Sequence, residues 1–229
     1  MELLANILAT EPAAPRVTVY NEDTGARLDF SGITLDNWFS GITLDNWAAK
    51  VANMLREESG LDAGATICID LPPSWQSIVI ALGALAAGIT PHFGATSDHP
   101  ESEALFVTPD HTVSGDVDTY LVTDDPFGRG VEECGATLPD GAIDFAPTVR
   151  FYGDQFFEPT PRIQDLTATN PLQPNTRIIS RGWTDLDGFT HAVINPLAAG
   201  GSAVIVAGTP TPERIDAICA AEKVSARNL

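Results

Sequence analysis

Basic residues are scarce in this chain of 229 residues, which carries 12 lysines and arginines against 31 aspartates and glutamates. The formal net charge of −19 creates a negative potential that repels nucleic-acid backbones and anionic lipid head groups. Neither nucleic acid nor a membrane surface is therefore expected as a partner. The acidic residues are scattered and form no long tail, so their direct effect is to keep the protein soluble.

Cysteine is rare as well. Cys68, Cys134 and Cys219 lie far apart and form no C-x-x-C pair, so neither a disulfide framework nor a zinc knuckle is indicated. The apolar stretch 78–89 is too short to span a membrane, and the N-terminus has no basic segment of the kind that starts a secretion signal. These absences predict a cytoplasmic protein with reduced thiols.

The beginning of the chain predicts two antiparallel strands. Residues 16–20 alternate and are β-branched, turn residues follow, and residues 27–30 complete the pattern of a hairpin. The sequence Phe30–Trp38 then recurs letter for letter as Phe39–Trp47, a tandem duplication. The second copy leads into a helix predicted over 43–58, with Thr43 as its N-cap. The first copy is not needed for this helix and is expected to bulge out or form a separate turn.

Strand–helix–strand patterns follow, and they predict parallel sheets with helices on their faces. The predicted strands are 65–71, 89–93, 104–108, 119–123, 177–180 and 202–206, and the predicted helices are 74–87, 185–199 and 212–222. The segment 124–174 is rich in glycine, proline and acidic residues and has only brief apolar runs, such as 149–152, which predicts an irregular connection between the lobes, with a hairpin as one option within it.

The predicted fold class is therefore α/β. A hydrophobic fraction of 44% supports a folded core, and 229 residues lie near the upper end for one domain. We expect a single domain over residues 1–229, made of two small doubly wound sub-lobes with mostly parallel sheets and a short antiparallel N-terminal hairpin. Sub-lobe 1 spans about 17–123 and sub-lobe 2 about 175–229.

Several segments together carry a familiar pattern. They are the capped helix over 43–55, the turn and strand Ala63–Pro72, the helix end Ala81–Gly88, and the stretches Trp183–Phe189 and Asn195–Ser202. In this order they resemble the N-terminal part of the adenylate-forming, AMP-binding superfamily of acyl-CoA synthetases, luciferases and peptide-synthetase adenylation domains. The resemblance covers about 17–229 with gaps, and is nearest to a set of short bacterial proteins related to those synthetases.

The resemblance implies adenylation of a carboxylate by ATP, which needs a Ser/Thr/Gly-rich loop with a lysine around the phosphates. The corresponding region here, Asp165–Pro171, contains neither glycine nor lysine, and the chain's lysines, Lys50 and Lys223, lie in no such motif. The chain also ends before the family's later adenine-binding and Mg²⁺-binding motifs and its small C-terminal domain. Without the cation, the transition state loses several kcal/mol of electrostatic stabilisation, so activity of the family type is not expected.

The sequence Gly128-Arg129-Gly130 does not replace that loop, because its spacing is wrong for dinucleotide binding and two glutamates follow it. The resemblance places Trp183, Thr184, Asp185 and Gly188 at the junction of the lobes, where ligands usually bind. We take these four residues as the ligand-binding candidates, with an N-cap and core role as the competing interpretation. Asp185 stands where the family often carries histidine.

Other chemistry-bearing residues give weaker signals. Imidazole and carboxylate ligands for a metal are offered by His92, His99, His111, Asp98, Asp110 and Asp116. Their spacing matches no ligand motif, so an ordinary loop is preferred and no metal site is predicted. His191 is placed on the predicted helix 185–199, where a packed or solvent-facing role is preferred to that of a base. No Gly-x-Ser-x-Gly motif occurs, and an acidic chain disfavours a cysteine nucleophile, so no catalytic residue is predicted.

The leading hypothesis is a truncated pseudoenzyme that retains the lobes of an adenylate-forming enzyme and acts as a binding or partner-contacting module without a cofactor. One alternative is an adenylating or acyl-binding enzyme completed by a partner chain that supplies the missing loop. Another is a structural subunit whose exposed sheet edge or helix face is buried in a homo-oligomer or against another protein. The sequence leaves the ligand open.

Overall fold

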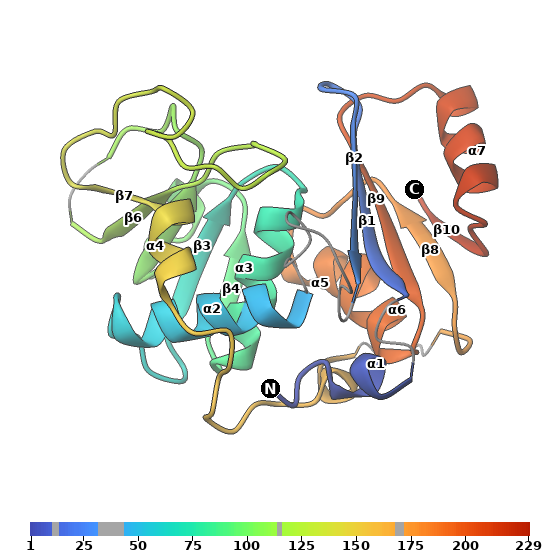
Figure 1. Cartoon of the computed structure of the whole chain (residues 1–229), viewed down its shortest axis with the longest axis horizontal. Coiled ribbons are helices and arrows are strands. Elements are labelled where there is room, and N and C mark those ends of the chain that lie inside the picture. Colours follow the sequence, from blue (N-terminus) through green and yellow to red (C-terminus); the bar gives the residue numbers. More distant parts are fainter. Residues whose placement is uncertain (11–13, 32–43, 114–115, 168–171) are drawn as a thin grey trace. The chain divides into compact units, whose positions relative to one another are not determined.

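The computed structural model describes all residues except 11–13, 32–43, 114–115 and 168–171. The chain forms two compact units, each with its own five-stranded sheet (Figure 1). The first unit contains Met1, residues 45–72 and residues 76–160, and the second contains residues 2–44, 73–75 and 161–229. The predicted α/β class is confirmed, with one sheet fully parallel and the other parallel except for one pair. No helix in the described part of the chain has the length and apolar character needed to cross a bilayer.

The sheet of the first unit has the strand order β4-β3-β5-β6-β7, and every pairing is parallel. Its strands are β3 (Thr66–Asp70), β4 (Thr90–Phe93), β5 (Ala104–Val107), β6 (Asp118–Leu121) and β7 (Ala142–Asp144). The helices around it are α2 (Leu44–Glu57), α3 (Trp75–Ala86) and α4 (Phe145–Phe151). The predicted strand–helix–strand pattern over 65–93 is thus confirmed to within one residue at each end.

One face of this sheet is an aromatic layer beneath the helices. Phe106 stacks on Tyr120 with ring centroids 4.9 Å apart, and the Tyr120 hydroxyl lies 2.7 Å from Oγ of Ser59, just beyond the end of α2. Helices α2 and α3 approach so closely that a Cβ on Gly83 would lie 2.5 Å from Cβ of Val51. Glycine at this position therefore sets the distance between the helices.

The segment 124–174 is more ordered than its composition indicated. Its residues Val131 and Leu138 pack on Val107 and Leu121 and cover the second face of the sheet. It also contains β7 and α4, so it is not the irregular connection that was predicted, and its apolar run 149–152 lies at the end of a helix. Strand β7 has only 3 residues, too few for an alternating pattern to be recognised.

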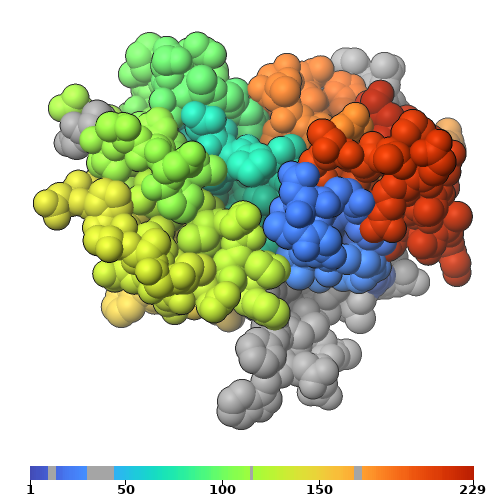
Figure 2. Space-filling view, turned by 90° about the horizontal axis from the view of Figure 1, so that it is seen from above, coloured from blue at the N-terminus to red at the C-terminus, as the bar shows by residue number. Residues whose placement is uncertain are grey.

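The sheet of the second unit has the order β10-β8-β9-β1-β2. Its strands are β1 (Pro15–Asn21), β2 (Ala26–Ser31), β8 (Arg177–Ser180), β9 (Ser202–Ala207) and β10 (Ala226–Asn228). The N-terminal hairpin is antiparallel, as predicted. Strand β1 then pairs in parallel with β9, from the far end of the sequence, and Figure 2 shows the blue N-terminal residues against the red C-terminal ones. Because β9 is buried along its whole length, it needs a strand on each side.

Helices cover both faces of this second sheet. Helix α7 (Pro212–Ala221) is capped by Thr211, whose Oγ1 accepts a hydrogen bond from the backbone N–H of Arg214, and it packs on β8 and β9. The predicted helix 185–199 consists of α5 (Leu186–Phe189), a π-helical turn (Thr190–Ile194) and α6 (Asn195–Ala198). A short helix, α1 (Ala5–Thr10), precedes β1. Phe30 and Ser31, the start of the first copy of the duplication, belong to β2, while its residues 32–38 and the predicted cap Thr43 lie outside the described residues.

Candidate functional site

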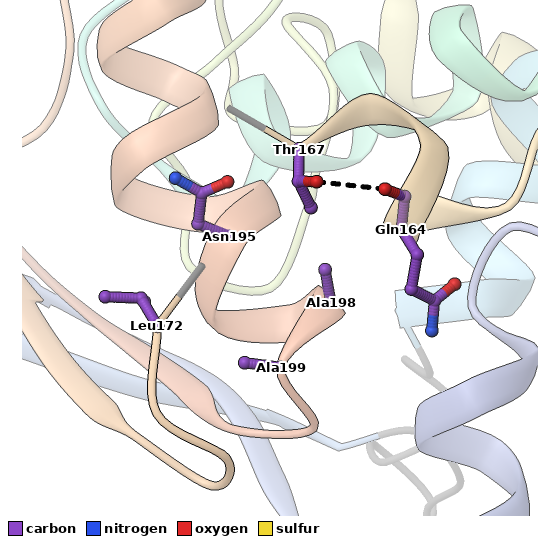
Figure 3. Close-up of a pocket in the computed structure, with 6 residues that line it drawn as sticks. All are labelled: Gln164, Thr167, Leu172, Asn195, Ala198 and Ala199. Atoms are coloured by element: carbon purple, nitrogen blue, oxygen red, sulfur yellow. Dashed lines mark hydrogen bonds between the residues drawn. The ribbon is translucent and has the colours of Figure 1, made fainter. Parts of the chain in front are cut away.

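A cavity of about 240 Å³ lies in the second unit, beside the C-terminal end of α6 (Figure 3). Its described lining consists of Gln164, Thr167, Leu172, Asn195, Ala198 and Ala199. Figure 3 shows the helix residues Asn195, Ala198 and Ala199 in the middle, with Gln164 and Thr167 on one side of them and Leu172 on the other. The hydroxyl of Thr167 donates a hydrogen bond to the backbone carbonyl of Gln164 at 2.9 Å, which links these two lining residues on the N-terminal side of 168–171.

The local sequence explains why the helix leaves space here. Pro196 lacks a backbone N–H and cannot continue the α-helical bonding pattern, and the turn before it widens so that the N–H of Asn195 reaches the carbonyl of Thr190. Asn195 is buried, while the short side chains of Ala198 and Ala199 fill little of the volume. Single π-helical turns of this kind are frequent at functional sites.

The chemistry of the cavity is neutral. Amides, a hydroxyl and aliphatic carbons line it, and none of the described lining residues carries an ionisable side chain. A triphosphate needs cations or converging N–H groups, whereas this lining suits a small uncharged molecule with a few polar atoms. A neighbouring cavity of about 510 Å³ shares Gln164 and has Arg162 together with Glu2 and Asp165 in its lining. Two carboxylates against one guanidinium do not favour an anion there either.

The ligand-binding candidates from the sequence lie at the start of this helix and are not among the residues that line the cavity. Asp185 is the N-cap, and its Oδ1 accepts a hydrogen bond from the backbone N–H of Gly188 at 2.7 Å. Trp183 is buried and packs edge-on against Phe189, with ring centroids 5.0 Å apart. Thr184 is exposed. These contacts support the structural interpretation, and ligand binding by the four residues stays a prediction.

His191 and Cys68, for which the sequence did not favour a catalytic role, have surroundings that do not favour catalysis either. The ring of His191 is 44% exposed, and its Nδ1 lies 2.9 Å from the carbonyl oxygen of Asp187 in the preceding turn. Burial, with the carboxylates of Asp70, Glu101 and Asp98 adding to it, raises the pKa of the Cys68 thiol to about 12. Cys68 is therefore a thiol at neutral pH and no nucleophile.

In the sequence Gly128-Arg129-Gly130, the hydrogen-bond donors of Arg129 and Gly130 are occupied by neighbouring carboxylates. The guanidinium of Arg129 binds Asp125, with Nη2 and Oδ2 2.7 Å apart. The backbone N–H of Gly130 donates to Oε2 of Glu133 at 2.7 Å. Negative groups thus stand where a phosphate would have to bind.

The predicted set of histidines and aspartates does not assemble as one group. The structure brings His92 and His99 together with Glu101, and their ligand atoms lie within 4.8 Å of one another. His111, Asp110 and Asp116 are not part of this cluster. Spacing does not reveal it, because His92 belongs to a strand and the other members follow a turn and a 3₁₀ helix.

The fold with these features is that of the acyl-CoA synthetases. An acyl-CoA synthetase of Brucella canis superposes with a TM-score of 0.74 at 15% identity, over 99% of this chain and 47% of that one. MatB of Rhodopseudomonas palustris superposes with a TM-score of 0.60 at 14% identity, over 96% of this chain and 47% of that one. This chain thus spans about half the length of both solved proteins. The resemblance predicted from the sequence is confirmed at the level of the fold.

A curated relative matches along nearly its whole length. The TIGR03089 family protein of Mycobacterium tuberculosis is 29% identical over 248 residues, which cover 97% of this chain and 95% of that protein. No known family profile matches this chain. The similarity to that relative therefore extends over both units described above.

Proposed function

We propose that this protein is a non-catalytic relative of the AMP-binding acyl-CoA synthetases, and that it acts as a binding module for a small uncharged molecule in the cavity of the second unit. The observation that carries the proposal is the lining of this cavity. Thr167 belongs to the segment Asp165–Pro171, which by resemblance stands at the position of the family's phosphate loop, and Leu172 directly follows it. The cavity that these two residues border has no charged side chain among its described lining residues.

Electrostatics supports a role other than ATP activation. Attack of a carboxylate on the α-phosphate of ATP, with pyrophosphate as the leaving group, builds up negative charge on the phosphates, and enzymes stabilise that charge with lysine, arginine or Mg²⁺. Near the cavity, Arg162 is accompanied by Glu2 and Asp165, and the segment Asp165–Pro171 holds no lysine. A net charge of −19 on the chain adds repulsion.

A cytoplasmic location is part of the proposal. Its support is the state of the thiols, since Cys68, Cys134 and Cys219 are all unpaired. Free thiols persist in a reducing compartment, whereas the cysteines of secreted proteins more often form disulfides.

Thermal unfolding with named probes tests the proposal, because a ligand that binds only the folded protein raises the melting temperature. We expect a panel of short neutral amides and alcohols to raise it, and ATP with Mg²⁺ to leave it unchanged. Ala198→Leu, which fills the cavity, should abolish the shift. Ala220→Leu, on the exposed face of α7, is the matched control and should retain it.

Pyrophosphate release separates this proposal from its catalytic alternative. We expect none when the purified chain is incubated with ATP, Mg²⁺ and a panel of carboxylates. Release by the isolated chain would refute the non-catalytic proposal. Release only after a second protein is added would favour the alternative of an enzyme completed by a partner chain.

A structural or partner-contacting role is the second candidate, and one observation favours it. Phe151 and Phe157 in the first unit have 88% and 87% of their surface exposed. Exposed aromatic rings of this size often lie in protein interfaces. Sedimentation of the wild type and of the double variant F151S/F157S tests whether these rings hold a homo-oligomer together. A monomer at high concentration in both proteins would count against a homo-oligomer.

A further inference from the structure

The side chains of three possible metal ligands converge in the first unit. One of them belongs to β4, the edge strand of its sheet, which is labelled in Figure 1. Oε1 of Glu101 lies 3.6 Å from Nε2 of His92 and 3.7 Å from Nδ1 of His99. The two imidazole rings stack with centroids 4.6 Å apart. All three side chains are partly accessible, so an ion from solution can reach them.

The backbone around the cluster is anchored to the sheet. His92 is paired with Cys68 of β3, and the chain then turns at Gly94, whose φ of +119° favours glycine. The N–H of Ser102 bonds the carbonyl of His99 at 3.1 Å, which closes the turn that carries the other two ligands. The carbonyl of Glu101 accepts a hydrogen bond from Oγ1 of Thr66, at the start of β3, at 3.1 Å.

The hydrogen bond made by Nε2 of His99 determines whether Nδ1, the nitrogen that faces Glu101, carries a proton or a lone pair. Nε2 lies 3.3 Å from the carbonyl oxygen of Phe93, and a carbonyl can only accept, so Nε2 carries the proton. In the neutral ring, Nδ1 then presents a lone pair toward the carboxylate of Glu101. Two lone pairs facing each other repel unless a cation lies between them. Metal-binding histidines characteristically fix their tautomer with such a second bond to a carbonyl.

We propose that His92, His99 and Glu101 form a binding site for a divalent transition-metal ion, with Zn²⁺ the best suited. Two imidazoles and one carboxylate are a donor set that zinc uses, with a further coordination position left for water. Tetrahedral zinc with bonds of about 2.1 Å needs ligand atoms roughly 3.4 Å apart, close to the distances around Glu101. The rings, now 16° from parallel, tilt on binding so that both nitrogens point at the ion.

Calorimetric titration of ZnCl₂ into the full chain, produced without a histidine tag and treated with a chelator, tests this site at about pH 8, where free imidazole is neutral. We expect one equivalent to bind. His99→Ala and the isosteric Glu101→Gln should each weaken binding at least tenfold. His111→Ala and His191→Ala are matched controls, since both remove a histidine outside the cluster, and they should bind like the wild type.

Cobalt substitution gives a second measurement, because tetrahedral Co²⁺ bound by nitrogen and oxygen absorbs visible light. The wild type with Co²⁺ should show this absorption, and His92→Ala should not. Circular dichroism of each variant establishes that it is folded. Absence of zinc binding by the folded wild type would overturn the proposal. Binding that persists in Glu101→Gln and His99→Ala, or falls equally in the controls, would overturn it too.

Discussion

Arg177 and Glu222 form an ion pair in the second unit, with Nη2 and Oε2 2.5 Å apart. Only 8% of the Glu222 side chain is exposed. Its other oxygen, Oε1, accepts hydrogen bonds from the hydroxyl of Tyr20 at 2.6 Å and from Nη2 of Arg27 at 2.8 Å. One carboxylate, at the end of α7, therefore ties together β1, β2 and β8.

This arrangement predicts a pH-dependent contribution of Glu222 to stability. Burial by itself raises its pKa, but hydrogen bonds from Tyr20, Arg27 and Arg177 outweigh burial and lower the pKa below its ordinary value of 4.5. A carboxyl group whose pKa is lowered by folding contributes stability that is fully present above 4.5 and is lost as the pH falls through the folded-state pKa.

The test is Glu222→Gln, which should lower the free energy of unfolding by about 1–3 kcal/mol at neutral pH. Urea unfolding at a series of pH values should show the difference from the wild type shrinking in acid. Glu213→Gln, at an exposed position of the same helix, should change stability by less than about 0.5 kcal/mol. A difference that is constant with pH would contradict the role of the charge.

Gly83→Ala tests the close approach of α2 and α3. The added Cβ would lie 2.5 Å from Cβ of Val51 and 2.7 Å from the carbonyl oxygen of Ala48, so the helices must separate. We expect a loss of about 1–3 kcal/mol in denaturant unfolding, although alanine is normally the better helix former. Gly153→Ala is the control, because its Cβ would make only ordinary contacts, at 3.7 Å or more, and stability should hardly change.

Regular local patterns in the sequence were sufficient to predict most of the fold. The strands on either side of α3 and the strands β8 and β9 on either side of the predicted helix 185–199 alternate or are wholly apolar, and glycine follows each helix, at Gly88 and Gly200. Short elements gave no such signal, which is why β7 and β10, with 3 residues each, were not predicted. The pairing of β1 with β9 is invisible for another reason, because it joins segments nearly the whole chain apart.

The candidate site was harder to predict than the fold. Asn195, Ala198 and Ala199 fit the pattern of a packed helix, and nothing in Gln164 or Thr167 indicates that they face it. The signal that was available is a proline inside the predicted helix 185–199, since proline interrupts the hydrogen bonding of the turn before it. The π-helical turn and the cavity beside it follow from that interruption.

Asp185 offers a way to separate its capping role from ligand binding. Its Oδ1 accepts from the N–H of Gly188, so Asp185→Ala should lower the free energy of unfolding by about 0.5–2 kcal/mol, measured by urea unfolding. Asn is as good an N-cap, so Asp185→Asn should keep the stability of the wild type. If Asp185→Asn is stable but loses the thermal shift with the neutral probes, the carboxylate contacts ligand. If it keeps the shift, Asp185 serves as a cap alone.

The three thiols are expected to differ in reactivity because their surroundings differ. Cys134 is exposed, whereas Cys68 and Cys219 are buried, and burial raises the pKa of Cys68 to about 12. Since the thiolate is the reactive form, an aromatic disulfide reagent at neutral pH should modify Cys134 rapidly in the folded protein and leave the other two unreacted. In guanidinium chloride all three should react. Cys134→Ser is the control that should remove the rapid phase, and rapid modification of Cys68 in that variant would show that β3 opens under native conditions, contrary to its burial in the sheet.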